Sequence, residues 1–225
     1  MALFVFILKH YMKVPFSLSF VKLKDYQKFS LIKNPTNVDL LKCILHVTDN
    51  DLSKMKSSKV DSLLNDLNKL FDDDPVFKPQ FTIYGTTYGF IPKLDDISYG
   101  ENKDITAYIN DWGNMHKAMA VMFRPVKHKF TSQYLIEDYE GSHVYAEVMK
   151  DMPLDIALGA MVFFYDLTNE LLNCIPKYLE KEIKQGQTTG AVSVENGADI
   201  LSSIALLKKT LQDLKKSLDY RYISA

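Results

Sequence analysis

The chain has 225 residues, of which 47% are apolar and 24% charged, and its formal net charge is -1 at pH 7. A chain of this length and composition buries a core without needing disulfides or a structural metal. The near-neutral charge argues against a specific nucleic-acid platform, because phosphate binding draws its affinity from clustered Lys and Arg.

The first residues, MALFVFIL, are apolar but have no basic flank before them and no small-residue cleavage site after them, so they are a poor signal peptide. The next longest apolar run, Ile156 to Tyr165, falls below the roughly 18 residues that a membrane span requires. We therefore expect a soluble protein that does not associate with a membrane. Cys43 and Cys174 fit buried thiols in a reducing compartment, with a disulfide as the alternative.

The first third of the chain has helical periodicity. Four segments space their apolar residues as amphipathic helices do: Leu23–Ile32, Val38–Val47, Asp49–Lys54 and Val60–Phe71. Asn34-Pro35 separates the first two, and Thr36 or Asn37 is expected to cap the second. Ser57 or Ser58 is expected to cap the fourth, and residues 72–80 are interpreted as a linker.

The period then changes from helical to alternating. FTIY, Gly85-Thr86 and TYGFI predict a β-hairpin near residues 81–91. Asp104 is expected to cap a helix from Ile105 to Phe123, which must stop near Arg124 because the residue before a proline disfavours helical geometry. Residues 126–141 are interpreted as irregular, with a short extended piece at 133–136.

The remaining third is again helical. Ser142 is expected to cap a short helix ending at Met149, and Pro153 to lie in the first turn of a main helix that runs to Leu172. The sequence thus predicts an N-terminal arm (1–21), a main helical domain (22–184), a flexible loop (185–197) and a C-terminal amphipathic helix (198–225). The expected fold class is mostly α (α+β), with one small β-hairpin. Met12 is an alternative start to Met1, because the amphipathic pattern begins only after Pro15. The first eleven residues are then an upstream extension or, alternatively, an apolar strand or arm buried against a partner.

The segment from Phe81 to Val126 combines the hairpin, a polar turn and a Trp/Met/His helix ending at Arg124-Pro125, and GSHVYAEVMKDMPLDIALGAMVFFYDLTNELL follows it. This order resembles small proteins encoded among the virion morphogenesis genes of tailed bacteriophages, including crAss-like phages, that are tail-assembly-chaperone-like or virion-associated. The resemblance spans about residues 21–179 and lies in element order and local phrases.

The resemblance implies a non-enzymatic morphogenesis protein that binds other phage structural proteins in the host cytoplasm during assembly. It also leaves a homo-oligomer open. The alternative is a structural virion component, such as a head-to-tail ring, an adaptor or an encapsidated protein.

Catalytic, cofactor and metal sites are not predicted. His116, His128 and His143 lack the spacing of zinc ligands, and the Asp runs at 72–74 and 95–96 lack that of a calcium loop. The scattered glycines match no phosphate-binding loop, and no serine stands in a nucleophile elbow. We therefore expect no enzyme activity.

Apolar side chains and one arginine are the candidates for partner binding. Trp112, Met115 and Met119 share one side of a helix, which is a core face or, alternatively, a Met-rich groove for a partner peptide. Phe164 lies in IALGAMVFF, which is apolar all round and so must be central core or an interface, and Gly159-Ala160 would let another helix approach it. Arg124 is expected to pair with the helix end, or with Glu137 or Asp138, or to contact a partner.

Overall fold

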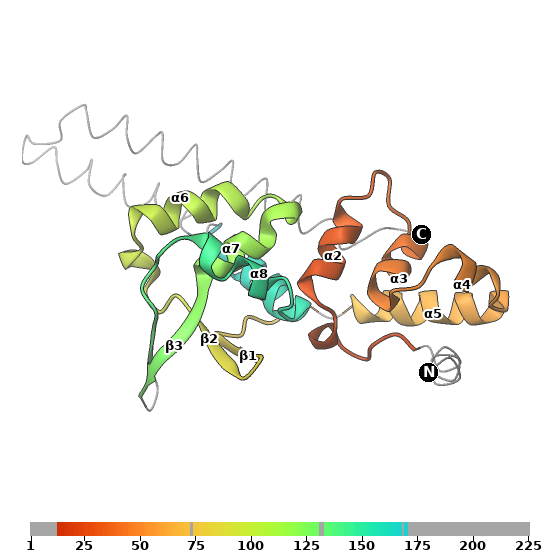
Figure 1. Ribbon diagram of the computed structural model, residues 1–225, viewed down its shortest axis with the longest axis horizontal. Coiled ribbons are helices and arrows are strands. Elements are labelled where there is room, and N and C mark those ends of the chain that lie inside the picture. Colours follow the sequence, from red (N-terminus) through yellow and green to blue (C-terminus); the bar gives the residue numbers. More distant parts are fainter. Residues whose placement is uncertain (1–12, 73, 131–132, 168, 171–225) are drawn as a thin grey trace, which may run out of the picture.

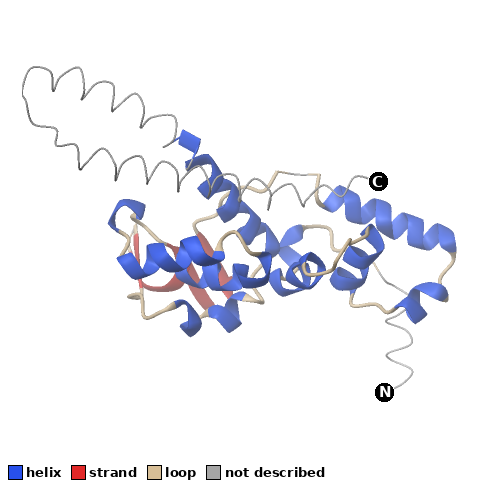
Figure 2. Cartoon of the chain, turned by 90° about the horizontal axis from the view of Figure 1, so that it is seen from above, coloured by secondary structure: helices blue, strands red, loops and turns tan. Residues whose placement is uncertain are grey.

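The computed structural model describes residues 13–72, 74–130, 133–167 and 169–170. Within them the fold is α+β and dominated by helix, as predicted, with one antiparallel sheet of four strands. The predicted flexible loop at 185–197 and C-terminal helix at 198–225 lie outside the described residues. Figures 1 and 2 show the strands gathered at one side of the molecule and the helices from residues 37–70 at the other.

The four predicted N-terminal helices are present, but the predicted cap of the fourth is wrong: Lys56, without a side-chain cap hydrogen bond, precedes it in place of Ser57 or Ser58. The helices are α2 (Leu23–Ser30), α3 (Asn37–Leu45), α4 (Asp49–Ser53) and α5 (Ser57–Leu70). Thr36 caps α3 and Thr48 caps α4, each in a capping box with the Asp three residues later. These reciprocal hydrogen bonds satisfy backbone N–H groups that the first helical turn leaves without partners.

The predicted hairpin is present as β1 (Gln80–Ile83) and β2 (Thr86–Phe90). Its two turn residues, Tyr84 and Gly85, have φ angles of 51° and 81°. Two successive positive φ angles match the twist of a hairpin, which is why glycine stands at the second position. The sheet continues through β3 (Phe123–Lys129) and β4 (Tyr134–Ile136), in the order β1-β2-β3-β4. The sequence predicted an extended piece where β4 lies, but β3 was not predicted.

The single helix predicted from Ile105 to Phe123 is wrong. The structure has α6 (Tyr99–Tyr108), a 3-10 turn η3 (Trp112–Asn114) and α7 (Met115–Met122) in its place. Asp111 breaks the helix, because its carboxylate accepts hydrogen bonds from the Gly113 backbone N–H at 2.8 Å and from the Asn114 side chain at 2.6 Å. The cap is also earlier than predicted, since Ser98 and not Asp104 caps α6, in a capping box with Glu101.

After β4 the chain forms a 3-10 turn η4 (Ser142–Val144), the short helix α8 (Ala146–Met149) and a helix whose described residues are 154–167 and 169–170. The last helix is buried on every side from Ile156 to Met161 and only partly buried from Val162 to Tyr165. Among the described residues, the nearest atoms to Gly159 belong to the backbone of the 72–80 linker and not to a second helix. A Cβ atom on Gly159 would lie 2.6 Å from the Val76 carbonyl oxygen.

One hydrophobic core runs through all of these elements. Its centre is α7, where Met115, Ala118, Met119, Val121 and Met122 are inaccessible to solvent. The edge of Tyr26 from α2 meets Trp112 with ring centroids 4.7 Å apart, so the N-terminal helices and the sheet region share this core.

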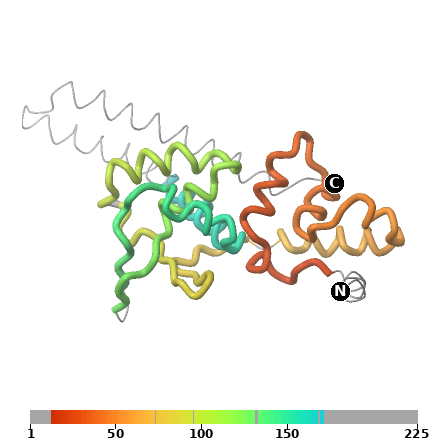
Figure 3. The backbone as a smooth tube through the Cα atoms, viewed as in Figure 1, coloured from red at the N-terminus to blue at the C-terminus, as the bar shows by residue number. Residues whose placement is uncertain are grey.

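Residues before α2 belong to this core as well. Leu18, in the 3-10 turn η1 (Leu18–Phe20), and Val21 are buried, although the sequence placed both in an arm. Val21 O accepts a hydrogen bond from Leu154 N at 2.8 Å, and Leu23 N donates to Met152 O at 2.9 Å. Figure 3 shows this red segment beside the blue-green residues near 150. The segment before α2 is therefore joined by hydrogen bonds to the start of the helix at 154–167, which we call the closure.

Side chains reinforce the closure. The Asp151 carboxylate pairs with Lys22 at 2.9 Å and Lys24 at 2.7 Å and accepts the Tyr84 hydroxyl at 2.7 Å. Burial opposes the charge, but the hydrogen bonds from Lys24, Lys22 and Tyr84 hold the pKa of this carboxyl well below its usual range. One carboxylate thus joins the N-terminal segment, the hairpin turn and the end of α8.

Candidate functional site

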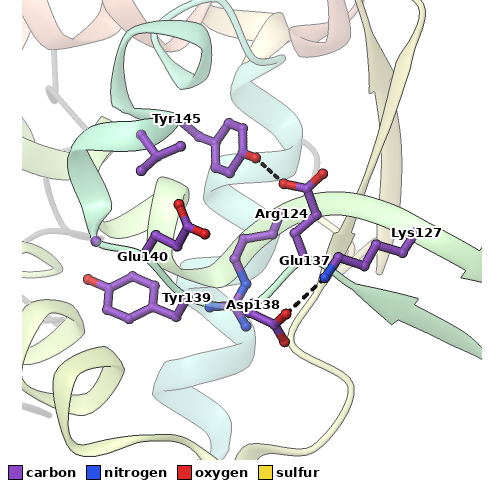
Figure 4. A pocket seen from close by; sticks show the side chains of 9 residues that line it. Arg124, Lys127, Glu137, Asp138, Tyr139, Glu140 and Tyr145 are labelled. Carbon is purple, nitrogen blue, oxygen red and sulfur yellow. Dashed lines mark hydrogen bonds and ion pairs between the residues drawn. The ribbon is translucent and has the colours of Figure 1, made fainter.

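A pocket of about 250 Å³ opens where β3 begins, bounded by the residues that follow β4 and by η4. Charged and aromatic side chains line it, and Figure 4 shows seven of them: Arg124, Lys127, Glu137, Asp138, Tyr139, Glu140 and Tyr145. Gly141 and Val144 complete the wall. Of the predicted partner-binding residues, Arg124 alone lies in this pocket.

An irregularity in β3 brings the two cations of the pocket together. In a regular strand, side chains three residues apart point to opposite faces of the sheet, so Arg124 and Lys127 would not meet. The pairing of β3 with β4 shifts register between Val126 and His128, which leaves Lys127 as the extra residue of a bulge. A bulge redirects the side chain it carries, and both cations consequently line the same pocket.

Arg124 is the most buried of the pocket's charged groups, with 6% of its surface exposed. Its Nη1 lies 2.5 Å from Glu101 Oε1 on α6. Glu101 is therefore its ion-pair partner, in place of the predicted Glu137 or Asp138. Burial raises the pKa of Glu101, but hydrogen bonds from Ser98 and Arg124 outweigh it and lower the pKa overall. The Arg124 guanidinium also lies over the Tyr139 ring, 5.6 Å from its centroid. Its Nε–H is buried and has no acceptor among the residues that the structure describes.

Hydrogen bonds fix the two tyrosines of the wall. The Tyr139 hydroxyl donates to Asp104 at 2.5 Å, and the Tyr145 hydroxyl donates to Glu137. Burial and acceptance by Glu137 raise the pKa of Tyr145 to about 12, and burial and Asp104 raise the pKa of Tyr139 as well. Both phenols are therefore neutral donors at physiological pH.

The remaining charges are unequally matched. Lys127 pairs with Asp138 at 2.8 Å, and this ion pair is exposed, because 92% of the Asp138 side chain is accessible to solvent. Within the described part of the chain, no ion pair joins Glu137 or Glu140 to a basic side chain. The pocket can hold and orient a polar group, and its surplus charge is negative.

The other predicted partner-binding residues lie elsewhere. Trp112, Met115 and Met119 are buried in the core, which agrees with the core-face alternative, and they present no open groove in this conformation. Phe164 is half-buried, and its ring centroid lies 5.8 Å from that of Phe90 in a cluster with Phe77 and Phe163. The five predicted residues therefore do not form one surface.

The sequence did not single out the rest of the pocket. Lys127, Glu140 and Tyr145 were not candidates, and Glu137 and Asp138 entered only as partners for Arg124. The sequence carries little signal for the strand that holds Arg124 and Lys127, because residues 123–130, FRPVKHKF, do not alternate between apolar and polar.

His116 is buried, and its Nδ1 lies 3.0 Å from the Gln27 amide nitrogen, which also donates to the Trp112 carbonyl at 2.6 Å. Burial, together with Lys150 and Lys117, lowers the pKa of His116. Cys43 is a free, half-buried thiol, and burial raises its pKa. These groups take part in packing between α2, α3 and α7 and do not approach the pocket.

In the residues that the structure describes, His, Cys, Asp and Glu nowhere gather in threes with the geometry to hold a metal ion. Over the same residues, none of the helices combines the length and the apolar character needed to cross a membrane. Searches with this chain against protein-family models, curated proteins and solved structures returned no match. Its function must accordingly be argued from its own residues and from the resemblance given above.

Proposed function

We propose that this chain is a non-enzymatic protein of tailed-bacteriophage morphogenesis, similar to tail-assembly chaperones, that binds other phage proteins. Two arguments support the proposal. The first is the resemblance in element order over residues 21–179. The second is an exposed aromatic pair, Phe16 and Phe20, which are 87% and 63% exposed with ring centroids 4.7 Å apart.

Local geometry holds this aromatic pair on the surface. The turn η1 directs Leu18 into the core and leaves Phe16 and Phe20 outside. The Ser19 hydroxyl between them donates to Asp155 at 2.8 Å, which anchors the turn to the helix at 154–167. Rings that are already ordered lose little conformational entropy when a partner covers them, and adjacent exposed aromatics are typical of protein-binding surfaces.

A structural virion component is the second candidate, because the same aromatic pair would suit a permanent contact. The two candidates differ in the fate of the protein. A chaperone leaves before the particle is complete, whereas a component remains in it. Mass spectrometry of purified particles from the encoding phage separates them: absence from particles supports the chaperone and presence supports the component.

The double substitution Phe16→Ser with Phe20→Ser tests the binding surface. We expect the variant to keep its melting temperature within a few degrees, because both rings lie outside the core, and to fail to support particle assembly when it replaces the original protein. Phe130→Ser is the matched control, since Phe130 is 59% exposed but lies at the far end of β3. Normal assembly with the double variant would overturn the proposal. Loss of self-association in light scattering would identify a second copy of this chain as the partner.

A further inference from the structure

We infer that the pocket lined by Arg124, Glu140 and Tyr145 receives a basic side chain, Lys or Arg, from a partner protein. The inference rests on the proposed function only in assuming that this chain binds another protein, which supplies the side chain in the pocket. The pocket and the Phe16–Phe20 pair share no residues, so each can fail without the other.

Charge is the first argument. The pocket contains two cations and three carboxylates, and both cations are already neutralised. Arg124 pairs with Glu101, and Lys127 pairs with Asp138. Glu137 and Glu140 face the same space with no basic partner among the described residues. The uncompensated charge is therefore negative, which favours a cation and repels phosphate or carboxylate.

The buried Arg124 Nε–H is the second and independent argument. Arg124 is 6% exposed and lines the pocket, yet its Nε–H has no acceptor in the described part of the chain. Figure 4 shows its guanidinium among the other labelled side chains. A buried donor left without an acceptor costs about 1–3 kcal/mol, so native proteins supply an acceptor from protein, water or ligand. An occupant that brings an acceptor oxygen as well as a positive charge would satisfy this donor.

A Lys or Arg residue within a peptide chain meets both requirements, because its own backbone carbonyl is an acceptor and its side chain carries the cation. The size of the pocket agrees. At about 250 Å³ it is smaller than the roughly 300–1,000 Å³ that small-molecule sites usually occupy. The rings of Tyr139 and Tyr145 add walls on which a cation is favourable.

The test uses NMR of the full ¹⁵N-labelled chain with three small probes. N-acetyl-lysine N-methylamide carries both charge and carbonyl, N-acetyl-norleucine N-methylamide carries only the carbonyl, and n-butylammonium carries only the charge. We expect the lysine derivative to shift the Arg124 Nε–H resonance and the Tyr145 amide resonance in a saturable manner. The norleucine derivative should bind about fivefold more weakly because it lacks the ionic contact. n-Butylammonium should bind about fivefold more weakly because it lacks the carbonyl acceptor.

Substitutions locate the contact. Glu140→Gln removes the free carboxylate and should weaken binding of the lysine derivative about fivefold without changing the melting temperature. Glu147→Gln is the matched control, because Glu147 on α8 is an exposed glutamate outside the pocket, with its side chain 80% exposed, and it should leave binding unchanged.

Four outcomes would overturn the inference. They are the absence of a saturable shift, equal binding of the norleucine derivative, equal binding of n-butylammonium, and a stronger shift with acetate, which would make the pocket an anion site. An unshifted Arg124 Nε–H would show that water alone satisfies it. Failure of particle assembly to depend on Phe16 and Phe20, with the NMR result intact, would refute the proposed function and leave the pocket's chemistry standing.

Discussion

At the scale of single residues, buried polar groups connect parts of the chain that lie far apart in sequence. Gln27 on α2 reaches His116 and the Trp112 carbonyl, 89 and 85 residues further along. Because the Gln27 N–H donates, the His116 Nδ1 must accept and therefore cannot carry a proton. The packing of α2 on α7 thus depends on a neutral imidazole.

This dependence predicts that stability falls in mild acid. Burial and the nearby Lys150 and Lys117 lower the pKa of His116 below its usual 6.5, against the opposing effect of Glu147 and Asp111. A group whose pKa is depressed by folding gives its full stability above 6.5, and that stability is lost as the pH falls toward the folded pKa. NMR titration should show His116 titrating below 6.5, and the unfolding free energy from urea denaturation should decrease from pH 7 to pH 5. An imidazole that titrates above 6.5 would contradict the prediction, and His116→Gln should reduce the pH dependence.

The carboxylate of Asp151 likewise connects parts of the chain that are distant in sequence. We expect Asp151→Asn to cost about 1–3 kcal/mol at pH 7, because it weakens contacts with Lys22, Lys24 and Tyr84 together. Since folding depresses this pKa, the contribution is complete above the usual 3.8 and disappears as the pH falls further. Chemical denaturation measures the change. Asp138→Asn, at an exposed ion pair, should leave the unfolding free energy almost unchanged. An equal loss in both variants would refute the special role of Asp151.

At the scale of elements, the helix at 154–167 and the 72–80 linker touch through backbone. Helix propensity alone predicts that Gly159→Ala stabilises the protein by about 1 kcal/mol. The structure predicts the reverse, because the new methyl group would lie 2.6 Å from the Val76 carbonyl oxygen and 2.9 Å from its carbon. Backbone atoms yield less readily than a side chain, so we expect a net loss of about 1–3 kcal/mol.

Thermal and chemical unfolding of Gly159→Ala check this sign. Val76→Ala is the control: the Val76 side chain is 72% exposed, and its removal should alter stability by no more than about 0.5 kcal/mol. Combining the two substitutions should not restore stability, since the contact is with backbone. A stabilised Gly159→Ala protein would show that the linker moves away freely.

Local rules predicted the elements that local interactions determine. The capped helices α3 and α4 and the Tyr84-Gly85 hairpin followed from neighbouring residues alone. The break between α6 and α7 also has a local signal, since Asn110-Asp111 and Gly113 are turn residues. The helical spacing of Trp112, Met115 and Met119 nevertheless led to the prediction of one continuous helix. The strand β3 and the Arg124–Glu101 pair depend on contacts distant in sequence, which no short window contains. The pocket could not be predicted because it requires both the strand β3 and the Arg124–Glu101 ion pair.

At the scale of the whole molecule, residues 13–22 contribute buried side chains and backbone hydrogen bonds to the described fold. A chain beginning at Met12 retains Leu18, Val21 and the Val21–Leu154 hydrogen bond, so we expect its melting temperature to stay within a few degrees of the full chain's. A chain beginning at Leu23 loses two buried apolar side chains, each worth about 1.5–3 kcal/mol. For a protein of this size the melting temperature should then fall by roughly 10 °C or more.

Circular dichroism of the two shortened chains measures the difference. If both melt like the full chain, the closure between residues 21–24 and 150–154 contributes little. If both fail to fold, the segment before Met12 takes part in the fold, which would remove the case for Met12 as an alternative start.

The joining of residues 21–24 to residues 150–154 also bears on synthesis. Ser19 precedes its acceptor Asp155 by 136 residues. At about 5–20 residues per second, the ribosome therefore needs roughly 7–27 s between making one and making the other. Throughout that interval residues 21–24 have been translated but residues 150–154, which hydrogen-bond to them, have not, so this part of the fold cannot yet form. Products of premature termination before residue 150 never form it, and we expect proteases to remove them instead of letting them accumulate.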